Sequence, residues 1–246
     1  MHTQLWFTAL LNQLIGGPVA ALLNAMGIHP HDPHNPITDP IAMQIVVALI
    51  LLAFFVAVRI RLSVENPGKL QHLMEMVHET IAGQAEDILG HQAKRYVPFV
   101  MTLAFFILAG NLLGLIPSFL SPTQFASVPL GLAICTWVYY HFHGVRQQGA
   151  LHYLAHFAGP VPWWLKPLMF LIEIISHSAR VMSLTIRLYA NMFAGEMVTL
   201  AFFSLVPIAV PVLFLGLHTM VAFVQTMIFV ILTLIYLAGA VAEEEH

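Results

Sequence analysis

The sequence has very few charged residues for its length. Only 9% of its 246 residues are Asp, Glu, Lys or Arg, whereas a soluble globular domain has roughly 25%. Hydrophobic residues make up 59% of the chain. This composition lies far outside the globular range, so we expect an integral membrane protein.

The sequence also has only one cysteine, no Gly-rich phosphate-binding loop and no cluster of basic residues. Cys135 is the only cysteine, which excludes an internal disulfide and a CxxC-type metal site. The lysines and arginines are few and scattered, which excludes nucleic acid as a partner. His78-Glu79 begins a zinc-protease pattern, but position 82, where that pattern needs a histidine, is Ala82. We expect no cofactor and no catalytic site of these classes.

Histidines are the one abundant group of potential metal ligands, and they gather in two loops. The first group is His29, His31, Asp32 and His34, and the second is His141, His143, His152 and His156. Prolines keep the first group extended and irregular, and the second group lacks a supporting carboxylate. We interpret both groups as solvated side chains and predict no metal.

Apolar runs of helical length, without the ten-residue alternation of a β-barrel, predict an all-α integral membrane protein. Five runs are expected to span the membrane: residues 41–58, 96–116, 128–142, 167–206 and 211–242. As helices, the last two would be ~60 and ~48 Å long, against a hydrocarbon core of ~30 Å. We therefore expect them to form a steeply tilted hairpin about Pro207.

Two further elements are expected outside these spans. Lys69 to Leu89 is amphipathic, with apolar side chains such as Leu73 and Ile81 along one side, and should lie on the membrane surface. Residues 1–36 form an N-terminal outer segment, in which Gly16-Gly17-Pro18 breaks a short interfacial helix. Residues 37–246 then form a single membrane domain.

The basic residues predict the orientation of the chain. With residues 1–40 outside and five spans, all the loop cations fall on one side: Arg59, Arg61, Lys69, Lys94, Arg95, Arg146 and Lys166. The opposite loops contain no Lys or Arg. By the positive-inside rule, the N-terminus is outside and the C-terminus is cytoplasmic.

The stretch from Leu171 to Met197 is apolar and yet carries ionisable groups that lipid rejects. The positions Glu173, His177, Arg180, Leu184, Arg187 and Asn191 form one helical stripe, and all of them except Leu184 are polar. Glu196 lies nine residues beyond Arg187, a rotation of about 180°, and should face the opposite way. The helix therefore presents two different polar faces.

Arg187 is the most informative residue of this stretch. A guanidinium stays protonated, and at mid-membrane it costs at least ~2.5–3.5 kcal/mol. Its neighbours three and four positions away are Ser183, Leu184, Ala190 and Asn191, none of them acidic. A carboxylate partner must come from another helix or from another chain.

The hairpin predicts which polar groups lie level with one another. Glu196 and His218 are each eleven residues from Pro207, so we expect them to form a pair near the outer side. Gln225 should lie near the level of Arg187 and Asn191, deeper in the membrane. Ser176 lies with Glu173 and His177 at the inner end. The plainer interpretations are a satisfied core histidine for His218 and interhelical hydrogen bonds for Asn191 and Gln225.

Two functions fit a polar route interrupted by a fixed positive charge. One is the stator half of a rotary proton channel, in which a carboxylate on a neighbouring ring of subunits passes Arg187. The other is a self-contained secondary transporter or ion channel. Transporters often contain two matched, broken halves, and this sequence has no internal repeat. The first function is favoured.

The segment SLTIRLYANMFAGE, residues 183–196, resembles the signature helix of subunit a of F-type ATP synthases. In that helix an arginine is followed by an asparagine four positions later and then by an AGE triplet. Here these residues are Arg187, Asn191 and Ala194-Gly195-Glu196. The family more often has proline where this chain has Val181. The resemblance implies a non-catalytic proton-channel subunit in a bacterial cell inner membrane. It also implies two partners: a ring of c-type proteolipid subunits bearing a membrane carboxylate, and b-type subunits of the peripheral stalk. Proton specificity follows from this resemblance and from the Glu196 and His218 pair.

Overall fold

The computed structural model describes residues 5–27, 35–63, 67–116, 119–149, 153, 162–205 and 209–241. Within these ranges the regular structure is entirely helical and contains no β-strand. The α-helices are α1 (Trp6–Ala25), α2 (Asp39–Ile60), α3 (Lys69–Leu89), α4 (Ala93–Leu113), α5 (Ser127–Gln148), α7 (Lys166–Leu205) and α8 (Ala209–Val241). Two short 3-10 helices are η1 (Gly90–Gln92) and η2 (Pro122–Gln124). The predicted all-α class is confirmed.

Five helical stretches in the described part of the chain are long and apolar enough to cross a membrane: α1, α2, the continuous α3 and α4 unit, α7 and α8. Five spans were also predicted, but the two sets differ in one member: α1 meets the criterion, and the predicted span at 128–142 does not. That span is the longer helix α5, whose last turns carry His141, His143 and Arg146 and are too polar to meet the same criterion.

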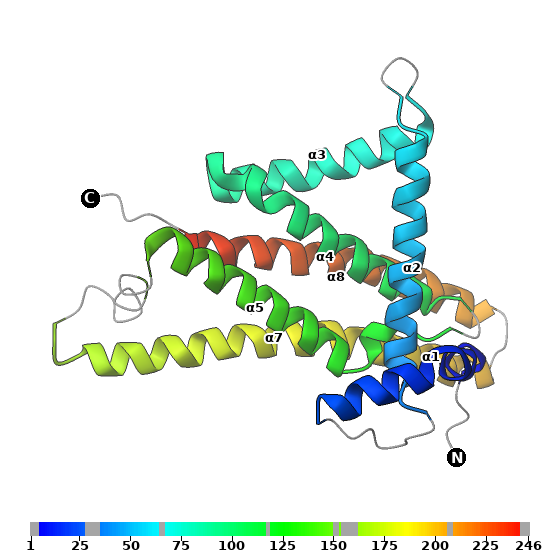
Figure 1. The fold of residues 1–246 in the computed structure, drawn as a ribbon. Coiled ribbons are helices and arrows are strands. Elements are labelled where there is room, and N and C mark those ends of the chain that lie inside the picture. The colour runs from blue at the N-terminus through cyan, green and yellow to red at the C-terminus, as the bar shows by residue number, and fades with distance from the viewer. Residues whose placement is uncertain are drawn as a thin grey trace.

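The long hairpin at the end of the chain is present as predicted. α7 has 40 residues and α8 has 33, and the two lie side by side along much of their length (Figure 1). Both run across the direction of α2, so they are steeply tilted if α2 crosses the membrane upright (Figure 1). α7 continues without interruption through Val181, where proline is more usual in the family that the sequence resembles.

α3 has the predicted bounds, and its apolar side packs inside the protein. Ile81 and Ala85 are buried against α4 and α8, where Val97 and Val230 belong to the same cluster. Leu73, at the other end of the predicted apolar side, is 51% exposed. The amphipathic pattern therefore describes protein packing at one end of α3 and an exposed apolar surface at the other.

The N-terminal helix corrects one expectation. α1 is a single 20-residue helix that continues through Gly16, Gly17 and Pro18, because its packing beside the start of α2 offsets the lost hydrogen bond and the steric clash that an interior proline introduces. Asn12 fixes α1 to the start of α2: its Nδ2 donates to the Ile37 carbonyl, and the Ile37 N–H donates to its Oδ1, both at 3.0 Å. A domain boundary at residue 36 stays a prediction.

The orientation of α7 is set by an apolar stripe at helical spacing. Leu184, Leu188 and Met192 are buried against α4, α5 and α8 in a cluster that includes Ile107 and Phe229. The polar residues of α7 lie beside this stripe. Burial of these apolar side chains therefore decides which way the polar side chains of α7 point.

Candidate functional site

Arg187 lies in the middle of α7, half-buried and without an acidic partner in the described part of the chain. Its Nη2 donates to the Ser183 hydroxyl oxygen, one turn earlier on the same helix, at 3.1 Å. None of the ion pairs between described residues involves Arg187. A permanent cation in this position can attract a carboxylate from a neighbouring chain.

Asn191 and Gln225 connect the two helices of the hairpin one turn beyond Arg187. Asn191 Nδ2 donates to Gln225 Oε1 at 2.8 Å. Gln225 is 2% exposed and is among the largest fully buried side chains. This hydrogen bond gives the buried Gln225 amide a partner, without which its burial would destabilise the protein. It also holds α8 against α7 next to Arg187.

His218 lies against α7 at the level of Gly195. The ring is in hydrogen-bonding contact with the Gly195 backbone, and a Cβ added at Gly195 would lie only 2.8 Å from His218 Nδ1. His218 is buried, and its Nε2 has no hydrogen-bond partner among the described residues. Glycine at position 195 is therefore what allows the imidazole to approach the α7 backbone.

A cavity of about 220 Å³ lies between α7 and α8 beside His218. Its walls include Asn191, Gly195 and His218, together with apolar side chains such as Phe214 and Val221. The cavity thus reaches from the histidine to the amide next to Arg187. The lining is mostly apolar, but the side chains of His218 and Asn191 give water molecules in this space two polar partners.

Glu196 faces η2 and not His218. The Glu196 carboxyl group lies next to the Gln124 side chain. The prediction that Glu196 and His218 lie level with each other agrees with the contact between His218 and Gly195. Among the described residues, however, no ion pair joins Glu196 to His218. Glu196 of α7 faces Gln124, and His218 of α8 contacts the neighbouring residue Gly195, so the two side chains lie at the same level on different sides of α7.

The 3-10 helix η2 is held in place by a buried polar network. Thr123 Oγ1 donates to Asn111 Oδ1 at 2.6 Å, and the Ser121 hydroxyl donates to the Gly110 carbonyl at 3.0 Å. This network positions Gln124 for its contact with Glu196. Sequence analysis did not single out Gln124; the available signal was the run of polar residues between two apolar spans.

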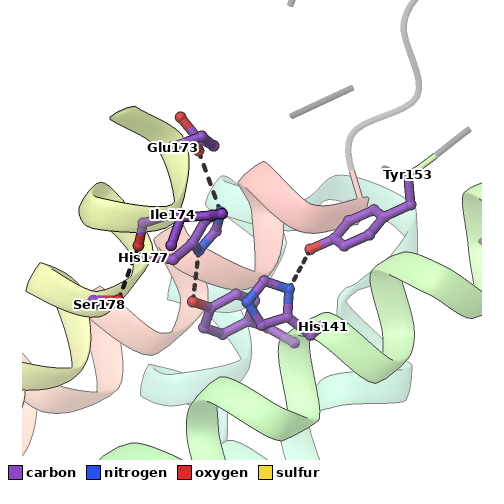
Figure 2. A network of polar contacts seen from close by, with 7 residues as sticks. His141, Tyr153, Glu173, Ile174, His177 and Ser178 are labelled. Atoms are coloured by element: carbon purple, nitrogen blue, oxygen red, sulfur yellow. Dashed lines mark hydrogen bonds and ion pairs between the residues drawn. The ribbon is translucent and has the colours of Figure 1, made fainter. Parts of the chain in front are cut away.

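The other end of the polar stripe is a hydrogen-bonded cluster (Figure 2). Glu173 Oε1 lies 3.2 Å from His177 Nε2, one turn along α7. His177 Nδ1 lies 2.8 Å from the Tyr140 hydroxyl oxygen of α5. Ser176, the third residue expected here, is half-buried and adjacent to His177. Tyr140 was missed because nothing in the sequence brings α5 to this face of α7.

Arg180 differs from Arg187 in having a clear partner. Its guanidinium lies over the Tyr236 ring of α8, 5.1 Å from the ring centroid, which is a cation–π contact. Arg180 and Arg187 lie seven residues apart on the same stripe. Of the two, Arg187 is the one that the fold leaves available for an anion.

Metal ligands do not come together in the described part of the chain, where no group of three or more His, Cys, Asp or Glu residues could hold a metal ion. The first histidine group, at residues 29–34, and His152 and His156 of the second group lie outside the described residues. His141 of the second group belongs to the cluster at His177.

Comparison with known proteins identifies the family. Residues 41–238 match the family described as ATP synthase A chain. The chain is 54% identical to ATP synthase subunit a of Koribacter versatilis over 242 residues, covering 98% of each chain. It is 46% identical to ATP synthase subunit a of Solibacter usitatus, covering 96% of this chain and 100% of that relative. These matches cover nearly every helix described above, and on this basis the chain belongs to the ATP synthase subunit a family.

Proposed function

We propose that this chain provides two proton half-channels to a rotating ring of c-type subunits, with Arg187 between them. As a member of the subunit a family, the chain is the proton-translocating stator subunit of the membrane sector of an ATP synthase. A self-contained transporter is not favoured. The observation that carries the residue assignment is the position of Arg187: it lies mid-helix, half-buried, and outside every ion pair of the described residues.

The outer half-channel uses His218 and Glu196. Protons reach this level from outside and move along the cavity between α7 and α8 towards Asn191 and Gln225. From there a proton passes to the carboxylate of a ring subunit. The cavity supports this assignment because it reaches from His218 to Asn191, one turn from Arg187.

The inner half-channel uses Glu173, Ser176 and His177 at the opposite end of the stripe. A ring carboxylate that has completed its rotation releases its proton on this side. Arg187 holds the ionised carboxylate electrostatically as it passes, and it keeps protons from moving directly between the two half-channels. Each proton crossing 100 mV releases ~2.3 kcal/mol, so a direct leak would dissipate the driving force.

This function includes partners and an orientation. The ring subunits supply the carboxylate that Arg187 lacks within the described chain, and b-type subunits of the peripheral stalk hold the chain still against rotation. The N-terminus lies outside and the C-terminus in the cytoplasm of a bacterium, with the helices in the cell inner membrane. The chain itself catalyses no reaction: it conducts protons for the catalytic sector.

Replacement of Arg187 tests the assignment. Arg187→Ala in the assembled complex is expected to abolish proton-driven ATP synthesis and to leave a passive proton leak, because the barrier is a charge and not a plug. Arg187→Lys keeps a cation but loses the planar guanidinium, and a large defect is expected there too. The measurements are ATP synthesis and proton flux in inverted membrane vesicles, with assembly checked by the subunit content of the purified complex.

Arg59→Ala is the matched control, because Arg59 is an exposed arginine at the end of α2 and far along the chain from α7. It removes the same charge and should leave synthesis close to the unmodified rate. Fully assembled Arg187→Ala complexes that make ATP at near normal rates would contradict the central role of Arg187.

A further inference from the structure

The cluster around His177 contains two tyrosine–histidine pairs in contact. In the first, the Tyr140 hydroxyl oxygen lies 2.8 Å from His177 Nδ1. In the second, the Tyr153 hydroxyl oxygen lies 2.7 Å from His141 Nδ1. The rings of His141 and His177 are 4.7 Å apart, centroid to centroid. Figure 2 shows His177 and Glu173 on one side of this cluster and His141 and Tyr153 on the other.

We propose that Tyr140, His141 and Tyr153 belong to the inner end of the proton pathway, where they make the His177 and Glu173 pair a station that holds one proton at a time. This proposal rests on the assignment of Glu173 and His177 to the inner half-channel. Its new content is that Tyr140 and His141 of α5, together with Tyr153, supply the groups around His177.

Tyr140 can hold His177 in either protonation state. When His177 is charged, or neutral with its proton on Nδ1, the Tyr140 hydroxyl accepts from Nδ1–H. When His177 is neutral with its proton on Nε2, the same hydroxyl rotates and donates to Nδ1. One neutral group therefore keeps the ring in place while its charge changes, so Tyr140 acts as a positioning residue.

The release step is a single proton transfer. The Nε2–H bond of charged His177 breaks, and an O–H bond forms on the Glu173 carboxylate. This leaves a neutral imidazole with its proton on Nδ1 and a neutral carboxylic acid. The side chain of Glu173 is 34% exposed, against 10% for His177, so Glu173 can pass the proton to water while His177 cannot.

Electrostatics limits the cluster to one proton. Several titratable or charged groups face His177 or its tyrosine partner: Glu173 and Arg180 from α7, Tyr140 and His141 from α5, Tyr153, and Tyr236 from α8. Two imidazolium rings 4.7 Å apart, beside the cation of Arg180, would repel each other strongly. Charging His177 therefore keeps His141 neutral.

Tyr153 keeps the His141 ring neutral. Burial raises the pKa of the Tyr153 hydroxyl to about 12, so the hydroxyl keeps its proton over the working pH range. It can donate that proton to His141 Nδ1 and stabilise the neutral ring. Gly144 makes room for this tyrosine, since a Cβ at position 144 would lie 2.5 Å from the Tyr153 ring.

The test compares Tyr140→Phe with Tyr139→Phe in inverted vesicles, where the bath sets the pH on the cytoplasmic side. Tyr139 directly precedes Tyr140 in α5, and its ring stacks on that of Phe99. We expect Tyr140→Phe to lower ATP-driven proton pumping by roughly three- to tenfold, the effect of one ordinary hydrogen bond. It should also change the dependence of pumping on bath pH. Tyr139→Phe should change neither.

A double mutant separates positioning from general loosening of the fold. If Tyr140 acts through His177, adding Tyr140→Phe to His177→Gln should lower pumping no further. Equal, independent losses in the two backgrounds would overturn the proposal, as would a Tyr140→Phe pH profile identical to the unmodified one. A change that follows the pH inside the vesicles would also overturn it, because the cluster would then serve the outer side.

Two further arms keep the result interpretable. If Tyr140→Phe complexes fail to assemble, Tyr153→Phe provides the same pH comparison through His141, and an unchanged profile there overturns the proposal. Arg187→Ala is measured in the same vesicles. Its failure to affect synthesis would remove the proposed function itself, whereas a normal Tyr140→Phe profile beside a defective Arg187→Ala removes only this inference.

Discussion

The α7 and α8 hairpin buries its ionisable groups differently on the two sides of Arg187. At the level of Gly195, His218 of α8 lies beside a cavity and its Nε2 meets no hydrogen-bond partner among the described residues. At the other end, both ring nitrogens of His177 have a partner: Nδ1 is hydrogen-bonded to Tyr140, and Nε2 lies 3.2 Å from Glu173 Oε1. One end is suited to conduction through water, and the other to direct transfer between side chains.

This difference indicates where each half-channel should be sensitive. Near His218 a cavity separates the polar side chains, so the shape of the cavity should affect proton conduction as much as any single contact does. In the packed end, loss of one hydrogen-bonding group leaves another buried group without its partner. The following predictions act on one end at a time.

The largest effect is expected from His218 and Glu196. Either His218→Ala or Glu196→Ala should lower proton flux by about a hundredfold, the lower range for loss of one acid–base group. Because the two residues lie level with each other, the exchange Glu196→His with His218→Glu should restore part of the flux. The measurement is proton flux in vesicles with equal complex content. No recovery in the exchanged variant would count against a shared role.

A smaller effect is expected from filling the space beside His218. In Gly195→Ala, the new methyl group would lie 2.8 Å from His218 Nδ1 and push the ring into the cavity. Flux should fall by roughly tenfold, which corresponds to about 1.4 kcal/mol. Gly216→Ala on α8 is the control, because nothing lies within 4 Å of a Cβ added there. Equal flux in the two variants would mean that the cavity is not part of the route.

The two histidines should differ in what they contribute to stability. His177→Ala leaves both Tyr140 and Glu173 without a partner, so it should lower stability by about 1–3 kcal/mol. His218→Ala removes a ring with a single hydrogen-bonding contact and should cost less. Thermal inactivation midpoints of the purified complexes measure both. A larger loss for His218→Ala would reverse the contrast between the ends.

The smallest effect on transport is expected from the amide pair between the two ends. Asn191→Leu alone leaves Gln225 buried and unsatisfied, and should destabilise the complex by about 1–3 kcal/mol. Asn191→Leu with Gln225→Leu replaces both partners by apolar groups and should recover most of that stability. If the double variant is stable but does not transport protons, the amides take part in conduction; if it transports protons, they only join the helices.

The sequence by itself determined the membrane class, the bounds of α3, the long hairpin and the absence of an acidic neighbour of Arg187 within α7. Each follows from local properties: the fraction of apolar residues, helical periodicity and the identity of neighbours one turn away. The same reasoning failed at Gly16-Gly17-Pro18, where a local helix-breaking pattern is overridden by packing of α1 on the start of α2. It also underestimated the length of α5.

Only the tertiary structure decided which side chains meet. Gln124 reaches Glu196 because the network at Asn111 fixes η2, and Tyr140 meets His177 from 37 residues away because α5 packs against α7. Such contacts depend on how whole apolar faces fit together, and the pattern of a single helix does not contain that information. Composition and periodicity therefore fix the helices and the place of Arg187 within α7, and packing between helices fixes its surroundings.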